Sequence, residues 1–291
     1  MSEVADRYLE QLYTTVETLR RRAIAYYDGV FHIGARISKA FERAKEIAEP
    51  VSYDVRDYLV VALAESEPVE KLESDVKNGL VEMYLGVAVV LVGLSGGELS
   101  GIYALPWLLE AIFDFYVELI ALVVVPTYIY LNFKKNSALD DTERRTNLFS
   151  GAMMVGIFLG HLIGPRIVSI SPSTLFLPPL LFALIVDHEL LVSPLPSYDR
   201  QVFFYMFAAV ILPIGALLST ISLGYFSFGV ILLTISHVAL LYVHFQVVMQ
   251  HIKDKQYSVG GSQIAYIAAV LFLQLFFTLV FGYNLEAKPR L

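Results

Sequence analysis

The amino-acid sequence predicts an all-α membrane protein with about seven transmembrane helices behind a charged, water-facing helical region. Hydrophobic residues make up 56% of the 291 residues and charged residues only 17%, whereas a soluble domain carries about 25% charged residues. Long apolar runs follow one another after Gly79, and about 20 residues of α-helix cross the hydrocarbon core of a bilayer. Backbone amides in lipid must bond within their own segment, which favours helices. The alternation of a β-barrel strand is absent.

The chain divides into three regions at Gly79 and near its carboxyl end. Residues 1–78 are interpreted as a cytosolic helical extension, 79–284 as the transmembrane domain and 285–291 as a short tail. Within the extension, apolar spacing predicts helices over 8–19, 30–48 and 51–64, the last two ended by Pro50 and Pro68. These helices would form a small cytosolic cap or lie on the membrane surface. Lipid or partner binding by the run Arg20-Arg21-Arg22 is the alternative.

Seven apolar runs are the predicted spans. They cover 80–94, 115–131, 147–163, 174–191, 201–223, 229–250 and 264–283. The first is short, because Ser95-Gly96-Gly97 is expected to end it. Residues 102–113 carry Tyr103 and Trp107 and are expected at the lumenal interface, where aromatic residues gather. The last run would either cross the membrane or re-enter it.

The distribution of lysine and arginine predicts a cytosolic amino terminus. With seven spans, 18 of the 21 basic residues lie on the side of the amino terminus, and cytoplasmic loops are the basic ones. The tail is then extracytosolic. A re-entrant last segment would instead leave Lys288 and Arg290 in the cytosol.

Several classes of function are disfavoured by composition and motifs. The net charge of −7 and the lack of a basic cluster argue against a nucleic-acid partner. Without cysteine there is no disulfide or thiol chemistry. The sequence contains no GxSxG, HExxH or phosphate-binding glycine loop, so we expect neither an enzyme nor a resident cofactor or metal. The expected partners are the lipid bilayer and other membrane proteins.

Histidines recur within the sixth predicted span. His237, His244 and His251 are seven residues apart and share one helical face. Seven residues rise about 10.5 Å, so two of them cannot ligate one zinc ion. Three interpretations stay open: a polar seam, an ion- or proton-responsive site, and a zinc-dependent membrane hydrolase. The seam would bond to Gln274, Thr278, Ser236 or backbone carbonyls, and the hydrolase would recruit His161 or Asp187-His188-Glu189.

Carboxylates form a second constellation before the second predicted span. Glu110, Asp114 and Glu118 are four residues apart and are expected along one helical face. Hard cations such as calcium favour clustered oxygen ligands. The pattern is read either as a solvated face or as a lumenal cation site.

The order of several segments resembles the Bax inhibitor-1 (transmembrane Bax inhibitor motif) family. In DDTERRTNLFSGAMMVGIFLGHLIGPRIVSISPSTLFLPP, an acidic-basic loop leads into a glycine-rich span that ends in Gly164-Pro165, and Pro172-Ser173 opens the next span. YVHFQVVMQHI and IAAVLFLQLFFTLVFGY resemble the sixth and last segments of the family. The resemblance covers about residues 74–283 and is carried by order and spacing.

The resemblance implies a seven-helix protein of the endoplasmic reticulum that restrains cell death and reticulum stress, contacts cell-death regulators and influences stored calcium. Family members with a calcium leak carry two membrane aspartates, whose positions are occupied here by His244 and Gln274. This departure argues against an acid-triggered leak. His237, His244 and Gln274 remain candidates for an ion- or pH-responsive site, and a cation leak channel or transporter is the alternative function.

Overall fold

A computed structural model describes residues 55–135, 141–170, 174–187, 194–255 and 257–282. The chain separates into two compact units, Met1–Val60 and Val61–Leu291. The predicted helices 8–19 and 30–48 and the tail 285–291 lie outside the described residues. Residues 55–63 are helical, which agrees with the later part of the third helix expected in the extension.

The described part of the chain is built from helices and contains no strand. The long elements are α2 (Ser74–Leu99), α4 (Phe115–Lys135), α5 (Asp141–Ile170), α7 (Arg200–Leu223), α8 (Phe228–Lys253) and α9 (Val259–Phe281). The short ones are η1 (Val69–Lys71), η2 (Ser100–Ala104), α3 (Pro106–Ile112), α6 (Leu177–Val186) and η3 (Leu195–Ser197). Each predicted apolar run overlaps one of the helices α2 and α4 to α9, which confirms the helical class.

Five of these helices are long and apolar enough to cross a membrane: α2 with η2, α5, α7, α8 and α9. The apolar part of α4 and the whole of α6 are shorter. α6 has only 10 residues and begins with prolines in its first turn, where proline fits because the amide it lacks has no partner there. α6 therefore fills only the middle of the span expected at 174–191.

One expected helix end was wrong, and a second is a kink within a longer helix. Gly96 and Gly97 do not stop the first span, because α2 runs through them to Leu99 and continues as a π-helical turn. Gly164-Pro165 does not end α5, which continues to Ile170 across a kink at Ile163 (φ −135°, ψ 19°). A proline in a helix removes one hydrogen bond and bends the axis, and neighbouring helices can support the break.

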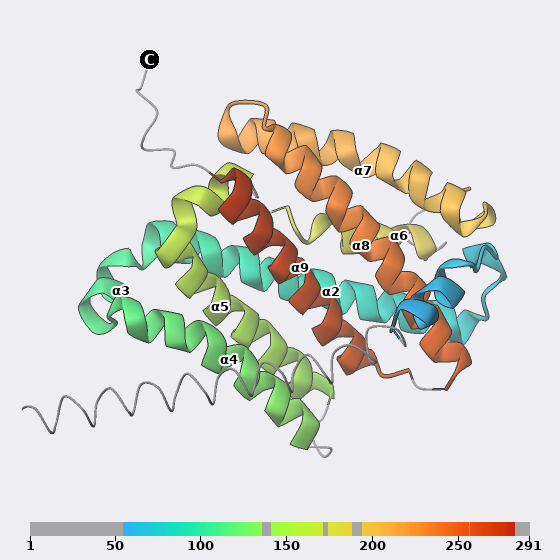
Figure 1. The fold of residues 1–291 in the computed structure, drawn as a ribbon, viewed down its shortest axis with the longest axis horizontal. Coiled ribbons are helices and arrows are strands. Elements are labelled where there is room, and N and C mark those ends of the chain that lie inside the picture. The colour runs from blue at the N-terminus through green and yellow to red at the C-terminus, as the bar shows by residue number, and fades with distance from the viewer. Residues whose placement is uncertain (1–54, 136–140, 171–173, 188–193, 256, 283–291) are drawn as a thin grey trace, which may run out of the picture. The chain divides into compact units, whose positions relative to one another are not determined.

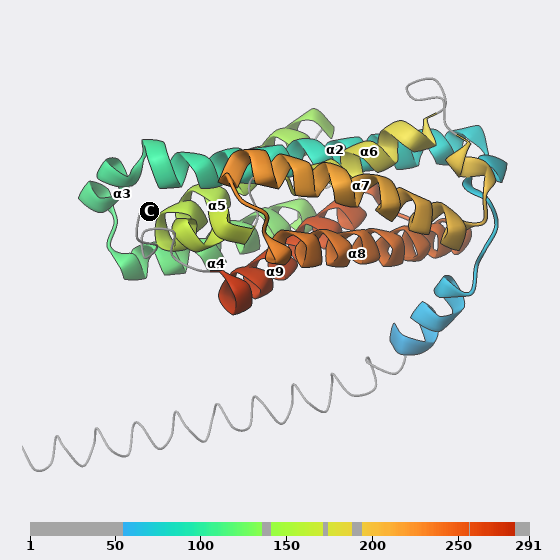
Figure 2. The same ribbon diagram turned by 90° about the horizontal axis from the view of Figure 1, so that it is seen from above.

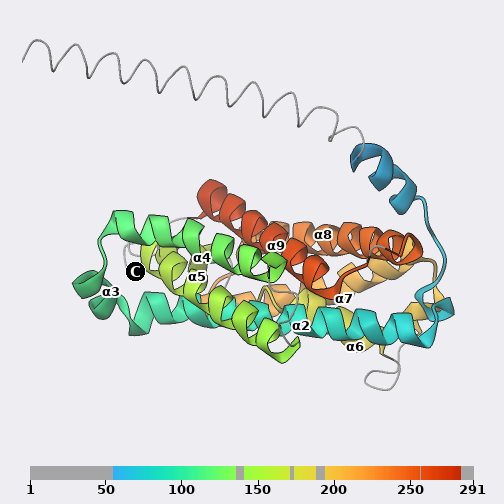
Figure 3. The same ribbon diagram turned by 90° about the horizontal axis from the view of Figure 1, so that it is seen from below.

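Glycines bring α2 and α5 into close contact. A Cβ on Gly97 would lie 2.2 Å from the Met153 carbonyl oxygen, and one on Gly160 would lie 2.1 Å from the Glu98 carbonyl oxygen. Gly101 and Gly156 are equally close to the opposite backbone. Small residues at such spacing let helix backbones approach. Figure 3 shows α5 lying between α2 and α4.

The remaining helices pack around α2 and α9. α9 contacts α2, α5 and α8, while α7 packs on α8, and Figures 1 and 2 show these helices running side by side. Aromatic rings of four helices fill the interior, with Phe182 of α6 within 6.1 Å (ring centroids) of five other rings. Those rings belong to Tyr84, Phe203, Phe204, Phe207 and Phe245. This apolar core leaves a single polar face of α9 for the site.

Candidate functional site

A row of polar groups follows one face of α9, where this helix meets α2 and α8. Ser262, Tyr266 and Gln274 on α9 each bond to a residue of another helix. The row extends about 18 Å at 1.5 Å per residue. We call Ser262, Tyr266, Gln274 and their partners the polar ladder.

The first rung of the ladder is His244. Its Nε2 lies 3.0 Å from the Ser262 carbonyl oxygen and its Nδ1 lies 3.0 Å from the Tyr84 hydroxyl. A carbonyl oxygen can only accept, so Nε2 donates to it, and in the neutral ring Nδ1 accepts from Tyr84. The rings of His244 and Tyr266 are 4.9 Å apart. His244 is thus fixed in one tautomer by α2 and α9.

The second rung joins His237 to Tyr266. His237 Nε2 lies 2.8 Å from the Tyr266 hydroxyl, and both side chains are buried. The Tyr84 and Tyr266 rings are 6.0 Å apart, so the tyrosines link the two histidine rungs. The sequence predicted a polar seam at these histidines. The structure confirms a backbone carbonyl partner for His244, and it adds Tyr84 and Tyr266 as partners in place of the expected Gln274, Thr278 or Ser236.

The third rung holds a buried carboxylate. Gln274 donates from Nε2 to Glu98 Oε1 at 2.7 Å, and the two side chains are 0% and 2% exposed. A carboxyl group is costly to place among apolar helices unless it is paired or neutralised, and such groups mark functional positions by default. Gln274 was predicted as a candidate from the sequence, whereas Glu98 was missed because it ends an otherwise apolar run.

Further buried oxygens lie on the two helices that carry Glu98 and Gln274. Ser95 Oγ, Thr278 Oγ1 and Gln274 Oε1 are buried and have no hydrogen-bond partner among the described residues. Ser95 precedes Glu98 by three residues on α2, and Thr278 follows Gln274 by four on α9, so each pair lies on one helical face. Carboxylate, hydroxyl and amide oxygens are the ligands that hard cations prefer. The third rung and its neighbours offer these three kinds of oxygen atom, from four residues, to a cation.

The predicted carboxylate face of Glu110, Asp114 and Glu118 was wrong. α3 ends at Ile112, and Asp114 begins α4 by accepting the amide of Phe115 at 2.8 Å, so the three residues do not share one helix. Glu118 is 1% exposed, and both its carboxylate oxygens lie 2.9 Å from His161 Nδ1. Exposed Glu110 lies 3.9 Å from His161 Nε2. The expected cation face is therefore a buried acid–histidine pair with one exposed neighbour.

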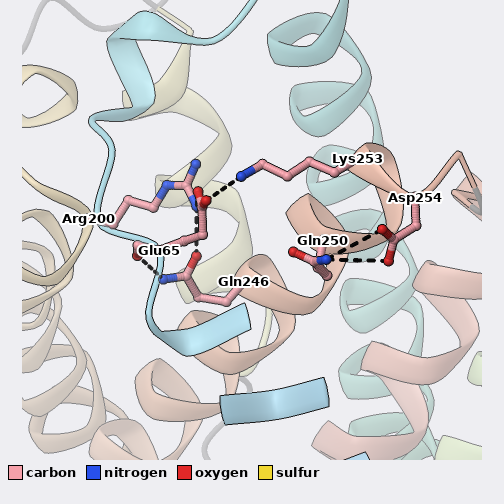
Figure 4. A network of polar contacts seen from close by, with 6 residues as sticks. All are labelled: Glu65, Arg200, Gln246, Gln250, Lys253 and Asp254. Carbon is pink, nitrogen blue, oxygen red and sulfur yellow. Dashed lines mark hydrogen bonds and ion pairs between the residues drawn. The ribbon is translucent and has the colours of Figure 1, made fainter. Parts of the chain in front are cut away.

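A second polar cluster lies where α7 begins and α8 ends (Figure 4). Buried Arg200 donates to Gln246 Oε1 at 2.9 Å and pairs with Glu65 at 3.4 Å, while Lys253 donates to the same carboxylate. Gln246 donates to the Glu65 carbonyl oxygen at 2.9 Å. The Lys253 hydrogen bond and the charges of Lys253 and Arg200 hold the pKa of Glu65 below its ordinary value, against the opposing effect of burial. Residues 61–73, here called the strap, are thereby fixed to α7 and α8.

The other sequence candidates are separated by the fold. His244 and Gln274 occupy different rungs, and no hydrogen bond joins them among the described residues. His161 bonds to Glu118 and not to a histidine of α8. His188 and Glu189 lie outside the described residues. In the part of the chain that the structure describes, no three histidine, aspartate or glutamate side chains are grouped to hold a metal ion, so the zinc hydrolase interpretation lacks a ligand set there.

Fold and site together define an all-helical chain with membrane-length apolar helices and ionisable groups buried between them. No protein-family model, curated protein or solved structure matches this chain.

Proposed function

We propose that the chain is a multi-pass membrane protein of the Bax-inhibitor-like kind, in which calcium or a similar hard cation leaks through the helix bundle past Glu98. The observation that carries this proposal is the bond between Glu98 and Gln274. Gln274 stands where the resemblance places the second aspartate of leak-competent relatives. A carboxylate from α2 therefore reaches the position at which the sequence alone showed only an amide.

The geometry of the polar ladder supports a path through the bundle. Three rungs follow one face of α9. Buried oxygens of Ser95, Gln274 and Thr278, on the two helices that meet at Glu98, have no hydrogen-bond partner among the described residues. A single negative charge with neutral oxygen ligands binds a cation weakly, and weak binding permits release as well as entry. The rigid contact between α2 and α5 holds Glu98 in place.

The cellular setting is part of the same proposal. The ordered family-like segments favour the endoplasmic reticulum, and the basic residues favour a cytosolic amino terminus with seven crossings. A leak that lowers stored calcium would restrain cell death and reticulum stress, the role implied by the resemblance. The partners would be the bilayer, calcium and membrane proteins that regulate cell death.

Calcium flux into proteoliposomes tests the proposal. The purified full chain is expected to raise flux above that of empty liposomes, and Glu98→Gln is expected to lower it about tenfold by removing the charged ligand. Glu110→Gln is the matched control, because Glu110 is exposed and lies outside the ladder, and it should keep the flux of the parent protein. Far-ultraviolet circular dichroism verifies that each variant is folded.

Two results would refute the leak. One is the absence of calcium flux by the parent protein at every pH from 5 to 8, the range in which histidine changes charge. The other is parent-level flux by the folded Glu98→Gln variant. In cells, the same variant should lose any protection against reticulum stress that the parent protein gives, while Glu110→Gln keeps it.

A further inference from the structure

An apolar cleft opens between α2, α4, α5 and α9, away from the polar ladder. Its volume is about 120 Å³, and its walls include Val90, Ile129, Ala152, Ile267 and Ala268. The surface of this cleft is almost wholly carbon. A cleft between membrane-length helices faces acyl chains rather than water.

A second, more polar hollow continues the cleft toward the beginning of α2. Its volume is about 490 Å³, and it shares Val90 and Leu148 with the apolar cleft. Asn78, Glu82 and Arg145 give it polar walls. Arg145 donates to Glu82, and both side chains are about half exposed. Together the two hollows form one groove, apolar at one end and polar at the other.

An unpartnered hydroxyl lies near the polar end. Tyr257 Oη is buried and has no hydrogen-bond partner among the described residues. Burial, together with the nearby negative charge of Glu82, raises the pKa of Tyr257 to about 12, so the hydroxyl keeps its proton at neutral pH. Tyr257 lies outside the walls of the hollow, so the guanidinium of Arg145 is the cationic group that the polar end presents.

The length of the groove matches one leaflet of a bilayer. From Asn78 to Leu94 the groove follows α2 for about 24 Å at 1.5 Å per residue, compared with about 15 Å for half of a hydrocarbon core. The remaining length corresponds to the headgroup layer. Arg145 lies near the beginning of α5, next to the loop that the basic-residue distribution places in the cytosol, so the polar end lies at the level of cytosolic headgroups.

We infer that this groove binds one phospholipid of the cytosolic leaflet, with an acyl chain in the apolar cleft and the headgroup phosphate at Arg145. Guanidinium groups bind phosphate through paired hydrogen bonds, and basic pockets between membrane helices favour anionic headgroups. Glu82 competes with the phosphate for Arg145, so the ion pair opens when the lipid binds. The site is separate from Glu98 and does not depend on the proposed leak.

Native mass spectrometry of the detergent-purified full chain tests this inference with phosphatidylserine, phosphatidylcholine and inorganic phosphate as probes. The parent protein should retain one phospholipid and prefer phosphatidylserine. Ala268→Trp fills the cleft from an exposed position and should weaken lipid binding about tenfold. Ala265→Trp is the matched control, because Ala265 is exposed on the same helix but lines neither hollow, and it should bind as the parent does.

Charge variants test the headgroup end. Arg145→Gln should weaken phosphatidylserine binding about tenfold, whereas Arg166→Gln, an exposed arginine near the other end of α5, should not change it. Glu82→Gln should strengthen binding, because it removes the competing carboxylate; a purely structural ion pair would give no gain.

Three outcomes would overturn the inference. Equal lipid retention by the parent, Ala268→Trp and Arg145→Gln would mean unspecific annular lipid. Binding of inorganic phosphate as tightly as phosphatidylserine would mean that the acyl cleft contributes nothing. Loss of self-association by Ala268→Trp in light scattering, without loss of lipid, would assign the groove to a second copy of the chain.

Discussion

The substitution Gly97→Ala tests the close contact between α2 and α5. The added Cβ would lie 2.2 Å from the Met153 carbonyl oxygen, whereas ordinary contact begins at 3.4 Å. The neighbouring atoms are backbone, so no side chain can turn aside, and α5 must retreat by roughly 1 Å at an overpacking cost of about 1–3 kcal/mol. The retreat also displaces Gly156 and Gly160, which hold the same interface.

The neighbouring residue supplies the control. A Cβ on Gly96 meets no atom within 4 Å. Alanine in a helix interior is favoured over glycine by about 0.5–1 kcal/mol, and this gain applies equally to Gly96 and Gly97. The free energy of unfolding should therefore rise in Gly96→Ala, and the two variants should differ by the overpacking cost alone, about 1–3 kcal/mol.

Unfolding in mixed micelles, titrated with a denaturing detergent and followed by circular dichroism, measures both free energies. The expected order is Gly96→Ala, parent, Gly97→Ala, from most to least stable. Equal stability of the two variants would refute the reasoning, because it would mean that α2 and α5 do not approach at Gly97.

Two more predictions concern the cluster that fixes the strap. Arg200→Met removes the buried cation of the cluster and should lower the free energy of unfolding by about 3 kcal/mol. Lys253→Met changes a side chain that is 45% exposed and should lower it by at most about 1 kcal/mol. The same unfolding titration compares the two variants, and equal losses of stability would contradict the buried pairing of Arg200. Because the pKa of Glu65 is lowered in the folded state, its contribution is fully present above the ordinary carboxyl pKa of 4.5 and is lost as the pH falls through the lowered value. Thermal stability measured from pH 7 to pH 3 should therefore fall less steeply in Glu65→Gln than in the parent, and parallel profiles would argue against the lowered pKa.

Helix positions were largely predictable from the sequence, since apolar length alone determines where a helix can lie in a membrane. Helix ends were less predictable. Gly96-Gly97 has the composition of a helix end, and its actual role depends on α5, which begins some forty residues later in the chain. The local sequence around Gly96-Gly97 cannot distinguish glycines that pack against a distant helix from glycines that form a turn.

The polar ladder was predicted only in part. The histidine spacing indicated a seam on α8, but its partners Tyr84 and Tyr266 are ordinary residues of apolar helices and carry no local signal. Glu98 was missed because the first span was expected to end at Ser95-Gly96-Gly97, which left its carboxyl group outside the predicted helix. Conversely, a regular spacing of four residues was misleading for Glu110, Asp114 and Glu118, because the helix is interrupted before Asp114 and the three residues do not lie on one helix. Spacing predicts a shared face only within an uninterrupted helix.

The dependence of α2 on α5 has a consequence for synthesis at the ribosome. α2 is made first, and its glycine face has no partner until α3 and α4 have been completed and α5 has entered the bilayer. During that interval Glu98 stands on an incomplete helix pair without α9, which is made last. The carboxyl group of Glu98 therefore stays without its Gln274 partner until the last described helix has been made.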